Sequence, residues 1–576
     1  MKKKLLRGET MKKKIISIAL STCVLASVAT AGVGCGNNSG EKVDKNRTQV
    51  YVNVLNCGIG TEFAYNLKAA YEKKNPKAQI MITTDETLEG EGLQSLKTNT
   101  DTDVIFAPNV ILQDFVSSKN GTSEYFADIT DIITADGENS ILAKMQTNQR
   151  AYHNIGTDEQ PKFYSLPWFV SYFGTVYDVD LFEEKKLYNI EGYAGLDCKV
   201  GTADDFFGPD GKENTYDDGL PATWEDMKIL LDEMVANNIT PFTWTSYKGY
   251  IESWMSSIMA SYEGADNYSL LTTLDGKYVY SEDTEWLSGG TLNEETGYME
   301  LDINRQNGYM LAYQNGKKAA LEFAEYIIQN NLYSAKALGT TQNHYEAQTE
   351  YLTSVELCKT DSKVQRIAFL AEGNWWENEA KDTFKDMEES YHEKYAYGTR
   401  RFGYFPWPKF IGSEDIPDQV HTETTLGGKV SCSSAVCVVN KISKNVDLAK
   451  DFVKFAYSDE GNAIFTTSTG VLRPFDYTLT NEQYNSLTYY QRTVYDLTRE
   501  ESTKKANGGT RMGLAYTANE YITGIFGVTG LSPNKSKYLQ PFTAFTASSG
   551  AGAVRTAEGY MDFVKRYVES NMTLWK

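Results

Sequence analysis

The feature that most constrains the fold is an alternation of strand-like and helix-like segments near the start of the chain. Residues 50–55 form an apolar, β-branched run, and Thr61 can cap an amphipathic helix that follows it. Asn75-Pro76 ends that helix, because proline disfavours helix at the residue before it. Residues 78–84 and 103–109 are the next two apolar runs. Strands joined by helices pair in parallel, so this region predicts an α/β fold.

The length of the chain predicts more than one hydrophobic core. A single core stops growing near ~250–300 residues, and this chain has 576. An aromatic turn at Tyr164–Trp168 leads into an apolar run at Gly174–Tyr177, and an acidic, helix-starting segment follows. Pro167 holds Leu166 extended. We interpret this stretch as the first crossing between two lobes.

The composition excludes some classes of partner. Acidic residues outnumber basic residues 77 to 56, and the net charge is −21. Nucleic acids and anionic lipid surfaces would be repelled by such a protein, whereas neutral ligands such as sugars would not.

The N-terminus resembles a secretory signal that ends in a lipidation site. Residues 1–34 contain a basic start and an apolar run, and Gly34-Cys35 has a small residue directly before a cysteine. We expect Cys35 to carry lipid and residues 35–48 to form a flexible tether. No later apolar run approaches the ~18–20 residues that span a bilayer, so the expected protein is anchored to the cell membrane from outside. A plain secreted protein with a free Cys35 is the alternative.

The remaining cysteines do not form a recognisable framework. No CxxC pair is present, which argues against a zinc site. Five cysteines follow Cys35, an odd number: Cys57, Cys198, Cys358, Cys432 and Cys437. The pattern favours a fold held by core burial.

A dense acidic segment at residues 197–220 is a candidate calcium site. Its carboxylates alternate with glycines, and Ca²⁺ prefers six to eight oxygen ligands. The spacing does not match an EF-hand, and a solvated acidic loop explains it equally well. The candidate ligands for a structural Ca²⁺ are Asp205, Asp210, Asp217 and Asp218.

The turn Gly58-Ile59-Gly60 superficially matches a dinucleotide-binding fingerprint. The third glycine position is occupied by Phe63, which would block the close approach of helix and strand that the fingerprint needs. The turn follows a strand, however, and can present backbone groups to another ligand.

Further along, the pattern predicts a helix after the cap Thr223 and a helix at 316–330. The polar, Gly- and Thr-rich residues 263–307 predict a loop-rich insertion. Near the C-terminus, Ser443 is a candidate cap for an apolar stripe that ends at Ala456, and a last helix is expected near 557–569.

Several of these segments together resemble one family. Residues 436–474 are similar to its SKN…AxxFxxF…TGxxP signature, and 220–227 resemble its PxTWEEL turn. Residues 239–245 resemble the family's IxPF strand, and residues 368–377 resemble its strand that ends in tryptophan. Residues 404–408 resemble the proline-containing segment that usually follows. The chain therefore resembles the extracellular solute-binding lipoproteins of carbohydrate ABC transporters, which are similar to maltose-binding protein.

That resemblance implies a type II periplasmic-binding-protein-like α/β fold with two lobes and three crossings, near Pro167, near Ser433 and just past Pro474. Lobe 1 would be 49–167 plus 434–475, and lobe 2 would be 168–433 plus 476–576. It also implies a sugar or oligosaccharide ligand between the lobes and a transporter permease as partner. The candidate ligand-binding residues are Asp85, Asn109, Trp168, Trp244, Trp254, Trp375, Trp376, Glu377 and Arg473.

Two other classes stay open at the level of sequence. A secreted glycosidase needs aromatic rings and two carboxylates, such as Glu377 with Asp85 or Glu62, but nothing singles out a pair. A lectin-like surface lipoprotein is the other alternative. The chain has no HExxH or GxSxG motif to support metal or serine hydrolysis.

Overall fold

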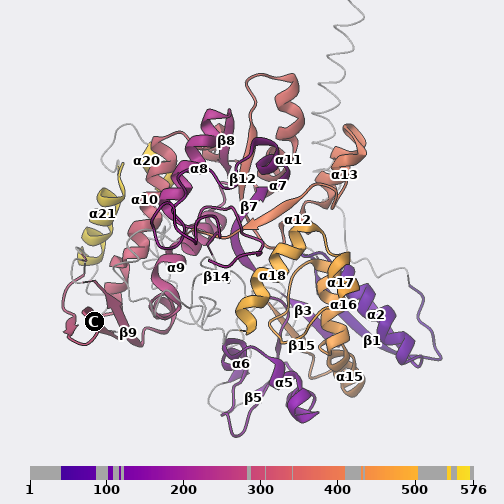
Figure 1. The fold of residues 1–576 in the computed structure, drawn as a ribbon. Helices are drawn as coiled ribbons and strands as arrows, with labels where there is room; N and C mark the ends of the chain where they lie inside the picture. The colour runs from indigo at the N-terminus through magenta and orange to yellow at the C-terminus, as the bar shows by residue number, and fades with distance from the viewer. Residues whose placement is uncertain are drawn as a thin grey trace, which may run out of the picture.

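The computed structural model describes most of the chain. The described residues are 41–85, 102–107, 116–117, 122–209, 211–281, 284, 287–304, 306–339, 341–408, 430–431, 435–503, 541–546 and 554–570. They form two lobes, each built on its own mixed sheet with its own hydrophobic core (Figure 1).

Lobe 1 contains a five-stranded sheet with the order β2-β1-β3-β15-β6. Its first strands, β1 (Thr48–Leu55), β2 (Ala78–Asp85) and β3 (Val104–Ala107), are parallel, as the alternating pattern predicted. Helix α2 (Glu62–Lys74) connects β1 to β2 and buries Phe63 and Leu67. It ends at Asn75, directly before the proline.

The C-terminal part of the chain returns to complete lobe 1. Strand β15 (Val436–Val439) pairs antiparallel with β3 and with the two-residue strand β6 (Leu166–Pro167). Helices α15 (Val446–Ala456) and α16 (Asp459–Thr469) follow, and α16 packs against α2. Segments that are far apart in the sequence therefore lie side by side in this lobe, at the lower right of Figure 1.

The expected cap of α15 is wrong. The helix begins at Val446 after Asn445, and Ser443 instead accepts the Asn445 N–H at 3.0 Å and donates to Asp103 at 2.5 Å. The serine is used in the preceding turn because a carboxylate from lobe 1 lies within its reach.

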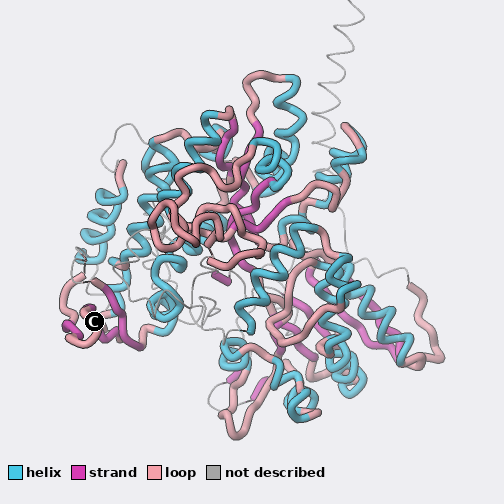
Figure 2. Tube along the Cα trace, viewed as in Figure 1, coloured by secondary structure: helices cyan, strands magenta, loops and turns pink. Residues whose placement is uncertain are grey.

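Lobe 2 is built on the sheet β13-β7-β12-β8, with β14 (Val430–Ser431) paired to β7. The strand β12 (Arg366–Gly373) is parallel to β8 (Ile239–Thr243) but antiparallel to β7 (Tyr172–Asp178), and β13 (Phe402–Phe405) is antiparallel to β7. All of β7 is buried, since helices cover both faces of the sheet (Figure 2).

Local signals define the helix after β7 and the helix before β8. Helix α7 (Val179–Lys185) is capped by Asp178. Helix α8 (Trp224–Ala236) begins after Thr223, as predicted, and the side chains of Thr223 and Asp226 form a reciprocal capping box. Its buried residues include Met227, Leu230, Leu231 and Met234, the apolar face expected from the sequence.

The predicted loop-rich insertion at 263–307 is wrong. It contains the part of α9 (Lys248–Thr273) that follows a kink at Gly264, and a three-stranded antiparallel sheet of β9 (Gly276–Tyr280), β10 (Thr291–Asn293) and β11 (Tyr298–Ile303). The segment is polar overall, but one face of this sheet is buried through Tyr278, Tyr280, Leu301 and Ile303. The period of two in those positions, rather than mean polarity, was the informative signal.

The outer helices complete lobe 2. Helices α10 (Asn315–Gln329), α20 (Pro541–Thr546) and α21 (Ala557–Ser570) pack together, and α11 (His344–Thr360) covers β12. Both α10 and α21 lie within a residue of their expected bounds. Within the described part of the chain, no helix is long and apolar enough to cross a membrane.

The chain passes between the lobes at separate places. Residues 168–171 lead from β6 to β7, and the second passage lies between β14 and β15. The chain returns to lobe 2 after Leu487, which still packs in the lobe 1 core, whereas Tyr490 and Val494 pack beside β12 and β13. Helix α18 (Tyr489–Thr503) therefore lies along both lobes.

Candidate functional site

The two lobes meet where β1 and β12 end. The turn Cys57–Gly60 follows β1, and Trp375 with the short helix α12 (Trp376–Glu379) follows β12. A Cβ atom on Gly58 would lie 2.2 Å from Trp375 Cδ1, so the glycine permits the close contact. Asn378 Nδ2 also donates to the Ile59 carbonyl. In α/β proteins ligands bind at such carboxyl ends of strands.

Trp375 is the central aromatic residue of this region. It is partly exposed and packs against the cores of both lobes. Its ring lies 5.4 Å from Phe173 and 6.4 Å from Tyr250, both in edge-on contacts. Of the predicted ligand-binding tryptophans, Trp375 is the one that the structure places between the lobes.

Further rings extend from Trp375 toward solvent. We refer to Tyr247, Tyr250, His344, Tyr345 and Trp375 as the aromatic cluster. Tyr250 stacks on His344 with centroids 5.8 Å apart and ring planes 16° apart. Tyr247 and Tyr345 are 66% and 56% exposed, which leaves ring faces open to a ligand. Trp375 follows β12, and the other four rings come from the starts of α9 and α11, so one strand end and two helix ends of lobe 2 position the cluster.

Carboxyl groups lie beside the aromatic cluster. We refer to Gln348, Glu372 and Glu379 as the carboxyl cluster. Gln348 Nε2 donates to Glu379 Oε2 at 2.6 Å and to Glu372 Oε1 at 3.1 Å, so both carboxyl groups adjoin one amide. Burial raises the pKa of Glu379 to about 7, and burial together with the neighbouring Glu379 carboxylate raises the pKa of Glu372 well above its ordinary value. His344 Nε2 lies 3.9 Å from Glu379, but burial lowers the pKa of that imidazole.

Trp376 and Glu377 turn away from the aromatic cluster. Trp376 is fully buried among Tyr351, Phe402 and Tyr490. Glu377 accepts a hydrogen bond from Thr488 Oγ1 at 2.5 Å, and burial raises its pKa to about 7. These two residues lie inside lobe 2, toward α18.

Trp168 and Arg473 lie inside lobe 1. Trp168 is buried between Phe63 and Phe106, each with a ring centroid 5.7 Å away. Arg473 donates to the Trp168 carbonyl at 3.1 Å and to the Ala456 carbonyl at 2.5 Å. It ties the first crossing to the end of α15.

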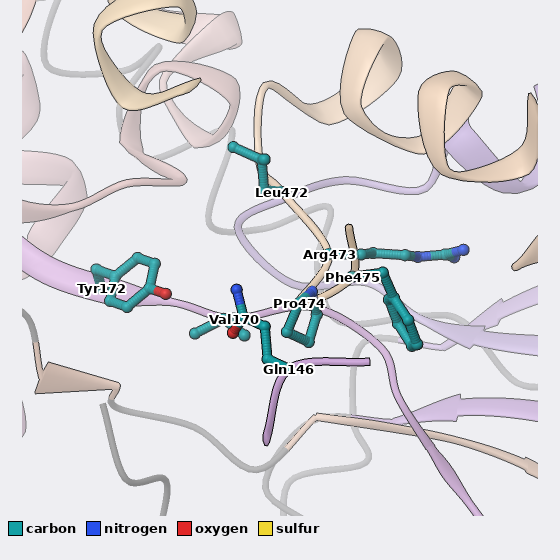
Figure 3. Close-up of a pocket in the computed structure, with 7 residues that line it drawn as sticks. All are labelled: Gln146, Val170, Tyr172, Leu472, Arg473, Pro474 and Phe475. Atoms are coloured by element: carbon teal, nitrogen blue, oxygen red, sulfur yellow. The ribbon is translucent and has the colours of Figure 1, made fainter. Parts of the chain in front are cut away.

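A small hollow adjoins the first crossing. It is lined by Gln146, Val170, Tyr172, Leu472, Arg473, Pro474 and Phe475. The Arg473 guanidinium points away from Tyr172 and out of the hollow (Figure 3). It lies instead over the rings of Tyr457 and Phe465, 4.3 Å from each centroid. The two rings that line this hollow, Tyr172 and Phe475, are buried, whereas Tyr247 and Tyr345 of the aromatic cluster are exposed.

Trp244 and Trp254 belong to the lobe 2 core. Trp244 stacks on Phe542 at 4.6 Å, and Trp254 Nε1 donates to Thr175 Oγ1 at 2.9 Å. Both side chains are fully buried, away from Trp375. Asp85 is the last residue of β2, whereas Asn109 and Cys35 lie outside the described residues.

The acidic segment forms two similar turns. Thr202 Oγ1 donates to Asp204 at 2.7 Å, and Thr215 Oγ1 donates to Asp217 at 2.8 Å. Asp205 accepts the Gly201 N–H at 2.6 Å, and Asp218 accepts the Asn214 N–H at 2.8 Å. Asp210 lies outside the described residues. Across the residues that the structure describes, no group of three His, Cys, Asp or Glu side chains has the arrangement of a metal site.

Sequence reasoning missed most of the site. Tyr250, His344, Gln348, Glu372 and Glu379 surround Trp375 but were not among the predicted ligand-binding residues. Tyr250 follows the end of β8, which is parallel to β12, so its position beside that strand end was the available signal. His344 and Gln348 come from α11, and no sequence pattern indicated that this helix contacts β12.

The fold and site define a two-lobed binding protein, and comparison with known proteins identifies its family. Residues 66–486 match the model of the bacterial extracellular solute-binding protein family, and the chain belongs to that family. No curated protein matches the sequence.

Solved structures similar to this chain include proteins described as sugar-binding or as solved with a saccharide. MalE from Xanthomonas citri has 12% identity and a TM-score of 0.50, with 91% of this chain and 98% of that chain covered. The GacH receptor of Streptomyces glaucescens, solved free and with acarbose, has 13% identity and a TM-score of 0.48, with 90% and 99% covered. At these identities the likeness concerns the fold alone.

Proposed function

We propose that the protein binds a saccharide between the turn Cys57–Gly60 and the aromatic cluster, and delivers it to an ABC transporter permease. The observation that carries this proposal is Trp375, a partly exposed ring at a strand end that contacts both lobes. Aromatic faces stack on the C–H faces of sugars, and carboxyl groups accept hydrogen bonds from their hydroxyls.

The neighbouring rings support a saccharide of more than one unit. Tyr247 and Tyr345 extend the aromatic cluster from Trp375 to the surface, which gives successive rings to stack on. The structural neighbours are described as sugar-binding, MalE by name and GacH by its complex with acarbose. Asp85 and Asn109 follow β2 and β3 on the lobe 1 side, so we propose them as further polar contacts.

The test is a saccharide screen followed by one substitution. A thermal-shift screen of maltose-series oligosaccharides and raffinose identifies a ligand, and calorimetry then compares the native protein with Trp375→Ala. Loss of one stacked ring costs on the order of 1–3 kcal/mol, or about tenfold or more in affinity. Tyr65→Ala, an exposed ring on α2 in lobe 1, is the matched control and should bind normally. Unchanged affinity in Trp375→Ala would exclude this site.

We further propose that the bound saccharide is released intact. The carboxyl groups nearest the aromatic cluster adjoin one Gln348 amide and are largely buried, which does not resemble two carboxylates on opposite sides of a glycosidic bond. Chromatography of the saccharide after prolonged incubation with the protein should show no shorter products. Cleavage would move the protein to the glycoside hydrolases.

We also propose that Cys35 carries the lipid anchor expected from the sequence. Support comes from the apolar run and the small residue before this cysteine. Cys35→Ser should release the protein into the medium, and mass spectrometry of the native protein should show a diacylglycerol adduct. A substituted protein that stays with the membrane fraction would contradict the proposal.

A further inference from the structure

The carboxyl cluster of lobe 2 has more hydrogen-bond acceptors than donors. Glu372 accepts from the Gly373 N–H at 2.8 Å and from Gln348, and Glu379 accepts from Gln348 and from the indole of Trp375. Gln348 is fully buried, and its Oε1 atom has no hydrogen-bond partner among the described residues. The Gln348 amide nitrogen contacts both carboxyl groups, so the unpaired Oε1 atom of the same side chain lies next to them.

One buried acid of lobe 2 is neutralised by basic side chains of the same lobe. Asp178 is held by Arg366 at 2.7 Å and by Arg400 at 2.8 Å. Within the part of the chain that the structure describes, neither Glu372 nor Glu379 forms an ion pair with lysine or arginine. Burying a carboxylate without a cation is costly, and the raised pKa values of Glu372 and Glu379 reflect that cost.

The carboxyl cluster is accessible from the proposed saccharide site. The Glu379 side chain is 12% exposed and the His344 side chain is 30% exposed, so Glu379 is the carboxyl group that reaches solvent. A Cβ on Gly58 would lie 3.0 Å from Glu379 Oε1 and 2.8 Å from Trp375 Nε1. The acceptors and the stacking ring therefore adjoin the same turn of lobe 1.

We propose that the carboxyl cluster is a subsite for an amino group on the solute, so that the ligand is a saccharide with a free amine. An ammonium group supplies a positive charge and three hydrogen-bond donors, which are what this group of acceptors lacks. The amine binds beside Glu379 while its sugar ring stacks on Trp375. This inference rests on the proposed saccharide function, and it specifies the class of saccharide.

The experiment compares matched ligands by calorimetry at neutral pH. The probes are a β-linked glucosamine oligomer, its N-acetylated counterpart of equal length and a neutral glucose oligomer. The free-amine oligomer should bind at least about tenfold more tightly than the other two, since a charge-assisted hydrogen bond is replaced by a neutral one in each of them.

Two variants distinguish this subsite from a general effect of protein charge. Glu379→Gln should abolish the preference for the amine, so that the three oligomers bind with similar affinity. The control is Glu356→Gln, which also removes one negative charge. Glu356 lies two turns after Gln348 in α11 and pairs with Lys359 at 2.6 Å, so this variant should still prefer the amine. Thermal melts of both variants establish that they are folded.

The outcomes separate this inference from the proposed function. Neutral saccharides that bind in a Trp375-dependent manner, with no preference for the amine, would overturn the subsite and leave the saccharide function intact. A preference that survives Glu379→Gln would also overturn the subsite. If none of the three oligomers binds, the amine subsite is rejected, and the wider saccharide screen decides the proposed function separately.

Discussion

Each lobe buries charge that no oppositely charged side chain neutralises, but the two lobes treat it differently. Lobe 1 buries the Arg473 guanidinium, which donates to two backbone carbonyls and lies between two aromatic rings. Lobe 2 buries Glu372, Glu377 and Glu379 around α12, with raised pKa values for all three carboxyl groups. The Arg473 guanidinium is hydrogen-bonded within lobe 1 and stabilises the fold of that lobe. Of the three acids, Glu379 lies beside Gly58 of lobe 1, which is why we propose it as part of a ligand subsite.

The largest effect is expected from removing the lobe 1 cation. Arg473→Met should lower the free energy of unfolding by about 4 kcal/mol, because the buried carbonyls of Trp168 and Ala456 lose their donors. Urea unfolding followed by fluorescence measures this change. A loss below about 1 kcal/mol would mean that the guanidinium is not structural and would end the contrast between the lobes.

Replacing a buried acid of lobe 2 should stabilise the protein, whereas replacing Arg473 should destabilise it. Burial raises the pKa of Glu377 from 4.5 to about 7, so the folded state binds a proton more tightly than the unfolded state. The stabilisation is complete below about pH 4.5 and is lost as the pH rises through about 7. Glu377→Gln should therefore be more stable than the native protein above neutrality, by up to about 2–3 kcal/mol, and similar to it in acid.

The control for this pH series is Glu388→Gln, an exposed acid on α13 (Lys381–Ser390). Its stability profile should follow that of the native protein across the whole range. Parallel profiles for Glu377→Gln and the native protein would show that the buried acid does not destabilise lobe 2.

A smaller effect tests the contact between the lobes. Gly58→Ala places a Cβ 2.2 Å from Trp375 Cδ1, so the indole or the turn must shift. Saccharide affinity should fall about tenfold, while the free energy of unfolding changes by less than about 1 kcal/mol. Gly559→Ala, in helix α21, is the control, because its nearest neighbour is a Thr556 side chain at 3.2 Å. Unchanged affinity would indicate that ligand does not need this contact.

The smallest effect concerns the acidic segment. If Asp205, Asp210, Asp217 and Asp218 bind Ca²⁺, a chelator should lower the melting temperature by a few degrees and added Ca²⁺ should restore it. An unchanged melting temperature would mean that the hydrogen bonds of the two turns, and not Ca²⁺, stabilise the segment. The calcium site stays a prediction until then.

The sequence predicted elements whose signals are local. The cap at Thr223 and the stop at Asn75 depend on neighbouring residues, and both are confirmed. Trp375 and Trp376 show the limit of such signals, since the two rings are adjacent in sequence and follow the same strand. Successive residues at the start of a helix point about 100° apart, so one ring lies between the lobes and the other in the core.

The rest of the site depends on contacts that no local pattern encodes. Gln348 and Glu379 meet only because α11 packs along β12. Arg473 was a candidate polar contact of the ligand, yet the carbonyl of Ala456 and the rings of Tyr457 and Phe465 bind it inside lobe 1. Its environment was determined by tertiary packing that the sequence alone did not reveal.

The two similar turns of the acidic segment have a consequence for how this protein can change over evolution. Each turn is closed by its own threonine and aspartates, and the Gly219 N–H donates to the Phe206 carbonyl at 2.7 Å, so the two turns also hold each other. The ends of the segment are fixed separately, by the bond from the Asn189 N–H to the Gly219 carbonyl and by Asp226, which accepts the Ala194 N–H at 2.7 Å. A change in the length of this segment that keeps both end contacts should therefore leave the sheet of lobe 2 in place.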